Sequence, residues 1–150
     1  MILPNFKDFD TKHRLLGIDW GMRRTGVAVS CDDGAFVFAR PVITMDNYKA
    51  DRLADHILKI ALDEGAGGIV IGLPLRTDGS ESDTTKMVRE FADVLAQKTD
   101  LPIAFIDETL TSSEAQEQMG RITRRDIKKE LDSNSARVIL ENAIEIIKRG

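Results

Sequence analysis

Residues 15–44 alternate short apolar runs with turns, a pattern typical of paired β-strands. The turn signal Asp32-Asp33-Gly34 separates the second run from the third, and Pro41 favours an edge position or a bulge for the third. The pattern therefore predicts a three-stranded antiparallel meander. Its strands are expected at residues 15–19 (LLGID), 25–30 (TGVAVS) and 36–44.

Beyond residue 44 the apolar spacing changes to that of helices alternating with buried strands. A meander followed by this alternation predicts an α/β fold, in which a mixed five-stranded sheet carries helices on both faces. We expect a single domain over residues 1–150, with 1–13 as an N-terminal arm. The further strands are expected at 67–74 and 102–107, and the helices at 48–64, 83–98, from a capping box at 111–114, and at 127–148.

Composition narrows the classes of protein that fit this chain. The single cysteine, Cys31, excludes an internal disulfide and a cysteine-based zinc site. No apolar run could cross a membrane and no signal peptide is visible, so a cytoplasmic location is expected. The net charge of −4 argues against a general nucleic-acid coat protein but not against a nuclease, whose catalytic carboxylates add negative charge.

Acidic residues at the ends of apolar segments are the candidates for chemistry. Asp19 ends an apolar strand, where a carboxylate is costly unless it is paired or bound to metal. Asp107 and Glu108 end the later strand, and spacing alone does not choose between them. Asp132 lies four residues before Ala136 on the apolar stripe of the last helix, although it could instead cap that helix.

Three or four converging carboxylates would suit phosphodiester hydrolysis, because two divalent ions about 4 Å apart can activate water and stabilise the phosphate. We therefore expect Mg²⁺ or Mn²⁺, as two ions, to be the cofactor. Asp78 and Asp83 could reach the same site, but we interpret them as turn and cap residues.

Four segments in series resemble the YqgF/RuvX family of RNase H-like proteins, described as pre-16S rRNA nucleases or Holliday junction resolvase homologues. The resemblance implies an RNase H-like fold and catalytic, metal-binding acids at Asp19, Glu108 and Asp132. The family usually has arginine where this chain has Thr109, and Arg76 or Lys128 could replace it. The matching segments are GIDWG with RTGVA (17–28), IGLPL with DGS (71–80), DETLT (107–111) and DSNSA with IL (132–140).

Basic residues near these acids are the candidates for binding nucleic-acid phosphates, which would position the substrate with little sequence readout. The alternative is an ordinary solvated charged surface. The candidates are Arg23, Arg24, Arg76, Arg124, Arg125, Lys128 and Lys129.

The favoured hypothesis is a metal-dependent nuclease that processes the 5′ end of pre-16S rRNA in ribosome biogenesis, with structured RNA as its substrate. The resemblance also allows a Holliday junction resolvase acting on four-way DNA junctions, which would suit a homodimer rather than a monomer. A third hypothesis is a catalytically silent RNase H-like nucleic-acid-binding module. An ATP-binding domain of the actin type fits poorly, because such proteins need two domains around the nucleotide.

Overall fold

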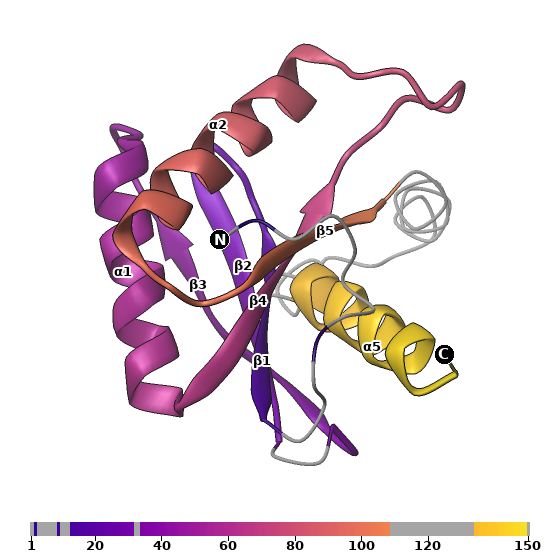
Figure 1. The fold of residues 1–150 in the computed structure, drawn as a ribbon. Coiled ribbons are helices and arrows are strands. Elements are labelled where there is room, and N and C mark those ends of the chain that lie inside the picture. The colour runs from indigo at the N-terminus through magenta and orange to yellow at the C-terminus, as the bar shows by residue number, and fades with distance from the viewer. Residues whose placement is uncertain (1, 3–8, 10–12, 32–33, 109–133, 150) are drawn as a thin grey trace, which may run out of the picture.

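The computed structural model describes residues 2, 9, 13–31, 34–108 and 134–149, and its elements follow the predicted order. Within these residues the meander comes first, and strands and helices alternate after it (Figure 1). The strands are β1 (Arg14–Asp19), β2 (Arg24–Ser30), β3 (Val37–Thr44), β4 (Ala66–Leu73) and β5 (Ile103–Asp107), and the helices are α1 (Ala50–Glu64), α2 (Asp83–Lys98) and α5 (Asn134–Arg149).

The five strands form one mixed sheet in the order β3-β2-β1-β4-β5. Strand β2 runs antiparallel to both β1 and β3, whereas β4 is parallel to β1 and to β5. The α/β class, the mixed five-stranded sheet and the RNase H-like element order are thus confirmed. Because β1, β4 and β5 are parallel, their carboxyl ends lie at the same edge of the sheet.

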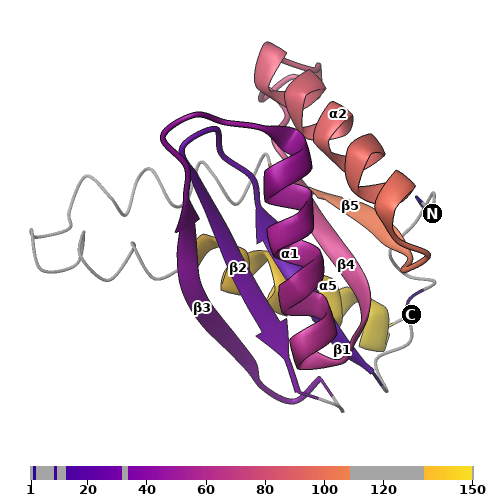
Figure 2. The same cartoon turned by 90° about the vertical axis from the view of Figure 1, so that its left-hand side faces the viewer.

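Helices cover both faces of this sheet, as Figures 1 and 2 show. Helices α1 and α2 pack on one face and α5 crosses the other. In β1, Leu16 and Ile18 belong to the core beneath α1 and α2, while Leu15 belongs to the core beneath α5. This alternation follows from the two-residue period of a strand, and it fixes the face on which every later side chain of β1 lies.

Helix α5 approaches the sheet closely over the middle of β1. A Cβ atom placed on Gly17 would lie 2.7 Å from Cβ of Leu140 and 2.9 Å from the carbonyl oxygen of Ala136. Both distances are shorter than real Cβ contacts allow, so α5 can sit at this height only because residue 17 has no side chain. Ala136, Ile139, Leu140 and Ala143 are all buried on this side of the helix, as the apolar stripe predicted.

Strand β3 lies at the edge of the sheet, and its pairing with β2 is irregular between Thr25 and Val27, which pair with Ile43 and Arg40. An extra residue is therefore inserted in β3 beside Pro41. Proline has no backbone N–H for a ladder hydrogen bond, so it is tolerated at an edge or a bulge. Both positions favoured from the sequence occur here together.

Helix α1 begins later than its apolar spacing suggested. It starts at Ala50 rather than at residue 48, because Lys49 has the extended backbone of an N-cap residue. The Tyr48 hydroxyl accepts a hydrogen bond from Trp20 Nε1 at 3.2 Å, and the two rings meet edge to face at a centroid distance of 5.4 Å. Tyr48 thus joins the start of α1 to the turn after β1 instead of extending the helix.

The described residues of the expected N-terminal arm contact the sheet. Ile2 forms a parallel β-bridge with Ile103, and Phe9 is buried in the core beneath α5. The helix expected from residue 111 and the start of the last helix before residue 134 lie outside the described residues. Among the described helices, none is long and apolar enough to span a membrane.

Replacing Gly17 with alanine should destabilise the protein by about 1–3 kcal/mol, because the added methyl group overpacks the contact between β1 and α5. Urea unfolding would measure this loss. Ser135→Ala, on the exposed side of α5, is the matched control and should change stability by less than about 0.5 kcal/mol. A Gly17→Ala variant as stable as the wild type would show that α5 does not approach β1 so closely.

Candidate active site

Two acidic side chains lie at the carboxyl-end edge of the sheet, on strands separated by β4. Asp19 is the last residue of β1 and Glu108 directly follows β5. The Glu108 backbone N–H donates to the Leu73 carbonyl oxygen at 3.1 Å, which ties this residue to the end of β4. The parallel register pairs Ile18 with Ile71, so Asp19 comes level with Gly72.

Both carboxylates lie on the face of the sheet covered by α5. In β5, Ala104 and Ile106 belong to the core beneath α5, and strand alternation places Glu108 on the same side. Asp19 follows Leu15 and Gly17, which also face α5. Asp107 points to the opposite side and is exposed. The choice between Asp107 and Glu108, which spacing left open, therefore falls on Glu108 as the residue that shares a face with Asp19.

Gly72 provides the space that the Glu108 side chain occupies. A Cβ atom on residue 72 would lie 2.5 Å from both Cδ and Oε1 of Glu108, and 2.7 Å from Cδ1 of Ile139 on α5. Any larger residue in the middle strand would displace the carboxylate. Sequence reasoning missed this role, although a glycine between Ile71 and Leu73 in a buried strand was a signal that something approaches closely.

Burial and mutual repulsion raise the pKa values of this pair. Desolvation raises the pKa of Asp19 to about 6. The pKa of Glu108 rises to about 8, first through desolvation and then through the negative charge of Asp19. Shifts of this size from burial and a like charge are frequent at catalytic sites. At neutral pH, Glu108 is therefore largely protonated when no cation is bound.

The pair suits a divalent cation by the chemistry of its donors. Carboxylate oxygens are the ligands that Mg²⁺ and Mn²⁺ prefer, and a bound cation would offset the repulsion between Asp19 and Glu108. The described residues contain no group of three or more histidine, cysteine or acidic side chains close enough to hold a metal ion. The third acid predicted for the site, Asp132, lies outside the described residues.

Three of the basic candidates, Arg23, Arg24 and Arg76, belong to described residues and lie around the same edge of the sheet. Arg23 and Arg24 are exposed and line a hollow with Thr44, Met45 and Asp46. Arg76 is exposed in the turn that follows β4. The remaining candidates, Arg124, Arg125, Lys128 and Lys129, lie outside the described residues.

The turn after β4 explains the other two acids. Asp78 accepts hydrogen bonds from the Ser80 backbone N–H at 2.9 Å and from the Ser80 hydroxyl at 2.6 Å, and these bonds lower its pKa. Asp83 lies in the first turn of α2, which Ser82 caps. Asp78 is thus a turn residue, as interpreted, whereas the cap is Ser82 and Asp83 contributes only a favourable charge at the helix start.

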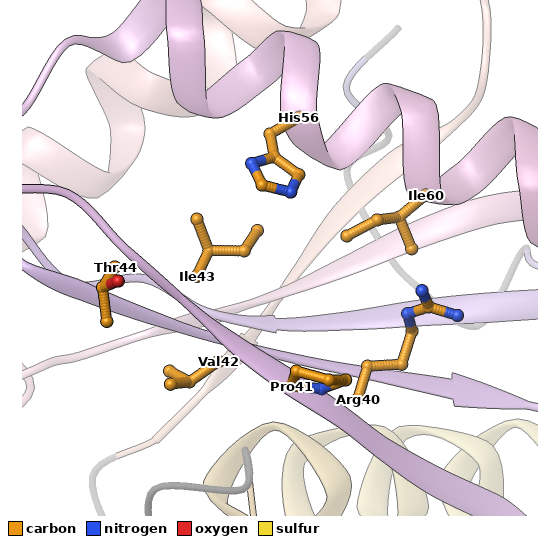
Figure 3. Close-up of a pocket in the computed structure, with 7 residues that line it drawn as sticks. All are labelled: Arg40, Pro41, Val42, Ile43, Thr44, His56 and Ile60. Atoms are coloured by element: carbon orange, nitrogen blue, oxygen red, sulfur yellow. The ribbon is translucent and has the colours of Figure 1, made fainter.

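A second hollow lies between β3 and α1 (Figure 3). Ile43 of β3 faces His56 and Ile60 of α1 across it, and the Arg40 side chain extends toward the helix at one end. Arg40 forms an ion pair with Glu64, which also binds Arg14. This hollow is on the α1 face, so the sheet separates its interior from the two carboxylates on the α5 face.

The raised pKa values predict that stability falls with rising pH when no metal is present. The unfolded chain titrates near the ordinary values of 3.8 and 4.5, whereas the folded groups titrate near 6 and 8. Between about pH 4 and pH 8 the folded state therefore holds more protons than the unfolded state, and its stability is lost progressively as the pH rises. The free energy of unfolding of the double variant Asp19→Asn, Glu108→Gln should exceed that of wild type by a larger amount at pH 8 than at pH 5.

Urea unfolding at both pH values with EDTA present would measure this difference. Asp107→Asn is the control, because this exposed carboxyl is adjacent in sequence but lies on the other side of the strand. Equal stability differences at pH 5 and pH 8 would contradict the raised pKa values of the pair.

Comparison with known protein sequences places this chain in a family. A family model described as "RuvX: Holliday junction resolvase" matches residues 13–146. A protein of Maridesulfovibrio salexigens named "Putative pre-16S rRNA nuclease" is 41% identical over 130 residues, which are 85% of this chain and 95% of that protein. A protein of Orientia tsutsugamushi with the same name is 39% identical, with 97% of this chain and 94% of that protein covered.

A solved structure titled "T. thermophilus RuvC in complex with Holliday junction substrate" aligns with a TM-score of 0.49 at 13% identity, covering 63% of each chain. The family assignment depends on the sequence matches, which extend over nearly all of the chain. This protein belongs to the RuvX family.

Proposed function

We propose that this protein is a metal-dependent nuclease whose divalent ions are held by Asp19, Glu108 and Asp132. The observation that carries the proposal is the pair of partly buried carboxylates of Asp19 and Glu108, at the carboxyl ends of parallel strands and on one face of the sheet. The nuclease names of relatives that cover most of the chain support the same reaction class.

The chain's own residues prepare the site for a cation in three ways. Gly72 leaves room for the Glu108 carboxylate, and Cδ1 of Ile139 on α5 occupies the same neighbourhood. Burial of Asp19 and Glu108 lowers the local dielectric, so that charges interact strongly. Glu108 would hold a cation as a carboxylate, its carboxyl proton having been released to solvent. Once bound, such ions supply an activated water and charge stabilisation at the phosphate.

The proposed substrate is structured RNA, namely the 5′ region of pre-16S rRNA, as the names of the relatives suggest. Such a nuclease would act in the cytoplasm, as a monomer or homodimer, during ribosome biogenesis. Arg23, Arg24 and Arg76 are exposed around the same edge of the sheet and would contact phosphates. Arg124, Arg125, Lys128 and Lys129 would extend this contact.

The alternative substrate is a four-way DNA junction. It is favoured by the description of the matching family model, which names a Holliday junction resolvase. Symmetric cutting of a junction needs two active sites, so this function would require a homodimer.

Glu108→Gln should abolish cleavage, because the amide keeps the shape of the side chain but provides no charged oxygens for a cation. Asp107→Asn is the matched control, since this neighbouring acid is exposed on the other side of the strand, and it should cleave at nearly the wild-type rate. Single-turnover cleavage rates with Mg²⁺ would make the comparison. If Asp107→Asn were inactive and Glu108→Gln active, the assignment of the site would be wrong.

Wild type should cleave an RNA containing the 5′ region of pre-16S rRNA in Mg²⁺ or Mn²⁺, and Asp19→Asn should retain the fold but not the cleavage. A four-way DNA junction assayed in parallel separates the two proposed substrates. Symmetric cutting of the junction, with the RNA left intact, would favour the resolvase. No cleavage of either substrate would favour a catalytically silent binding module.

A further inference from the structure

The hollow formed by Arg23, Arg24, Thr44, Met45 and Asp46, which we term the arginine hollow, lies where β2 begins and β3 ends. Because β2 is antiparallel to β1, its start is at the same edge of the sheet as the carboxyl end of β1. The hollow and Asp19 therefore share one edge. The order of strands puts the hollow on the β3 side of Asp19 and Glu108 on the β5 side.

Strand register places two of the lining residues, Arg24 and Thr44, on the same face as the carboxylates, whereas Met45 packs against the core beneath α1 and α2. Asp19 pairs with Gly26, and paired residues of an antiparallel ladder point to the same side. Arg24 is two residues before Gly26, so its side chain returns to this face, and Thr44 pairs with Arg24. Strands lie about 4.8 Å apart and rise about 3.4 Å per residue, so the Cα atom of Arg24 lies about 8 Å and that of Thr44 about 12 Å from the Cα atom of Asp19. Gly26, which lies between Asp19 and Arg24 on this face, has no side chain.

The turn that carries the arginines is fixed by its own hydrogen bonds. The buried Thr25 hydroxyl donates to the Gly21 carbonyl at 3.1 Å, and the Met45 N–H donates to the Arg23 carbonyl at 2.9 Å. A Cβ atom on Gly21 would lie only 2.2 Å from the Arg24 carbonyl oxygen. The two arginines thus project from a backbone that is already ordered, which reduces the entropy lost when they bind a ligand.

The charge of the hollow favours an anion. Among the described residues, Arg23 and Arg24 form no ion pair, whereas Arg14 and Arg40 both form ion pairs with Glu64. Asp46 is the one acid among the described residues that line the hollow, so these side chains sum to one positive charge. Exposed guanidinium groups beside a hydroxyl, here that of Thr44, are suited to phosphate oxygens.

We propose that the arginine hollow binds a backbone phosphate of the substrate strand, one or two nucleotides from the bond that is cut and on the β3 side of it. This inference rests on the proposed nuclease function and adds the path of the strand. The nucleic acid would cross the ends of the strands, from Glu108 past Asp19 and Gly26 to Arg24. The contact is independent of base identity, because only phosphate is recognised.

Binding can be measured without cleavage in the Asp19→Asn background, with a stem-loop RNA and a four-way DNA junction as probes. Adding Arg24→Gln should weaken binding about tenfold and lower the slope of log K against log salt by about one. Arg52→Gln, an exposed arginine of α1, is the matched control and should change neither. Asp46→Asn should tighten binding, a result that a purely structural role for the hollow would not produce.

Cleavage then locates the phosphate. The test replaces the phosphate one or two nucleotides from the cut with an uncharged methylphosphonate. In wild type this replacement should raise KM with little change in kcat. In Arg24→Gln the same replacement should change neither value. Equal sensitivity of both proteins, or an unchanged salt slope in Arg24→Gln, would overturn the subsite while leaving the nuclease intact. An altered salt slope without any cleavage would support the hollow and overturn the proposed function.

Discussion

Two carboxyl groups that would repel each other if both were ionised, held in a partly desolvated place, are the constraint around which this structure is organised. Asp19 and Glu108 would be more stable apart or in water, and their raised pKa values measure that cost. Backbone pairing holds both carboxyl groups in place despite this cost. Asp19 ends β1, and the Glu108 backbone is hydrogen-bonded to the end of β4. A site that is unfavourable when empty of cations is well prepared to bind them.

Two glycines make this arrangement sterically possible, and both lie under α5. Gly17 lets the helix approach the sheet, and Gly72 leaves the Glu108 carboxylate a place between the sheet and Ile139. The same helix thus buries the apolar core and brings Ile139 near the Glu108 carboxylate. Packing and chemistry are coupled here, so a substitution that lifts α5 from the sheet would also change the surroundings of the carboxylates.

The net charge of −4 does not predict whether the protein binds a polyanion such as a nucleic acid, because positive and negative side chains lie on different parts of the surface. Glu64 forms ion pairs with both Arg14 and Arg40. Arg23 and Arg24, at the edge that carries the two carboxyl groups, form no ion pair within the described part of the chain. Positive charge without a described ion-pair partner therefore lies at the edge that carries Asp19 and Glu108, where the proposed function would require phosphates to be held.

The sequence by itself determined the order of the elements and most of their extents. Period-two and helical spacing are local properties, so α2 was predicted at its observed bounds, and Pro41 correctly marked an edge with a bulge. Asp19 also stood out locally, as a carboxylate at the end of an apolar strand. By contrast, α1 starts at Ala50 after an extended Lys49, and Tyr48 contacts Trp20, 28 residues away, which no local pattern contains.

Only the tertiary structure decided which acid accompanies Asp19. Alternation shows that Asp107 and Glu108 point to opposite sides, but it does not say which side α5 covers. That depends on how β5 is registered against β4 and on the face that Ala104 and Ile106 bury. The roles of Gly72 and of the arginine hollow were hidden for the same reason, because strands distant in sequence create them. The sequence therefore shows which chemical groups each segment carries. Which of these groups lie close together is decided by strand register and helix packing.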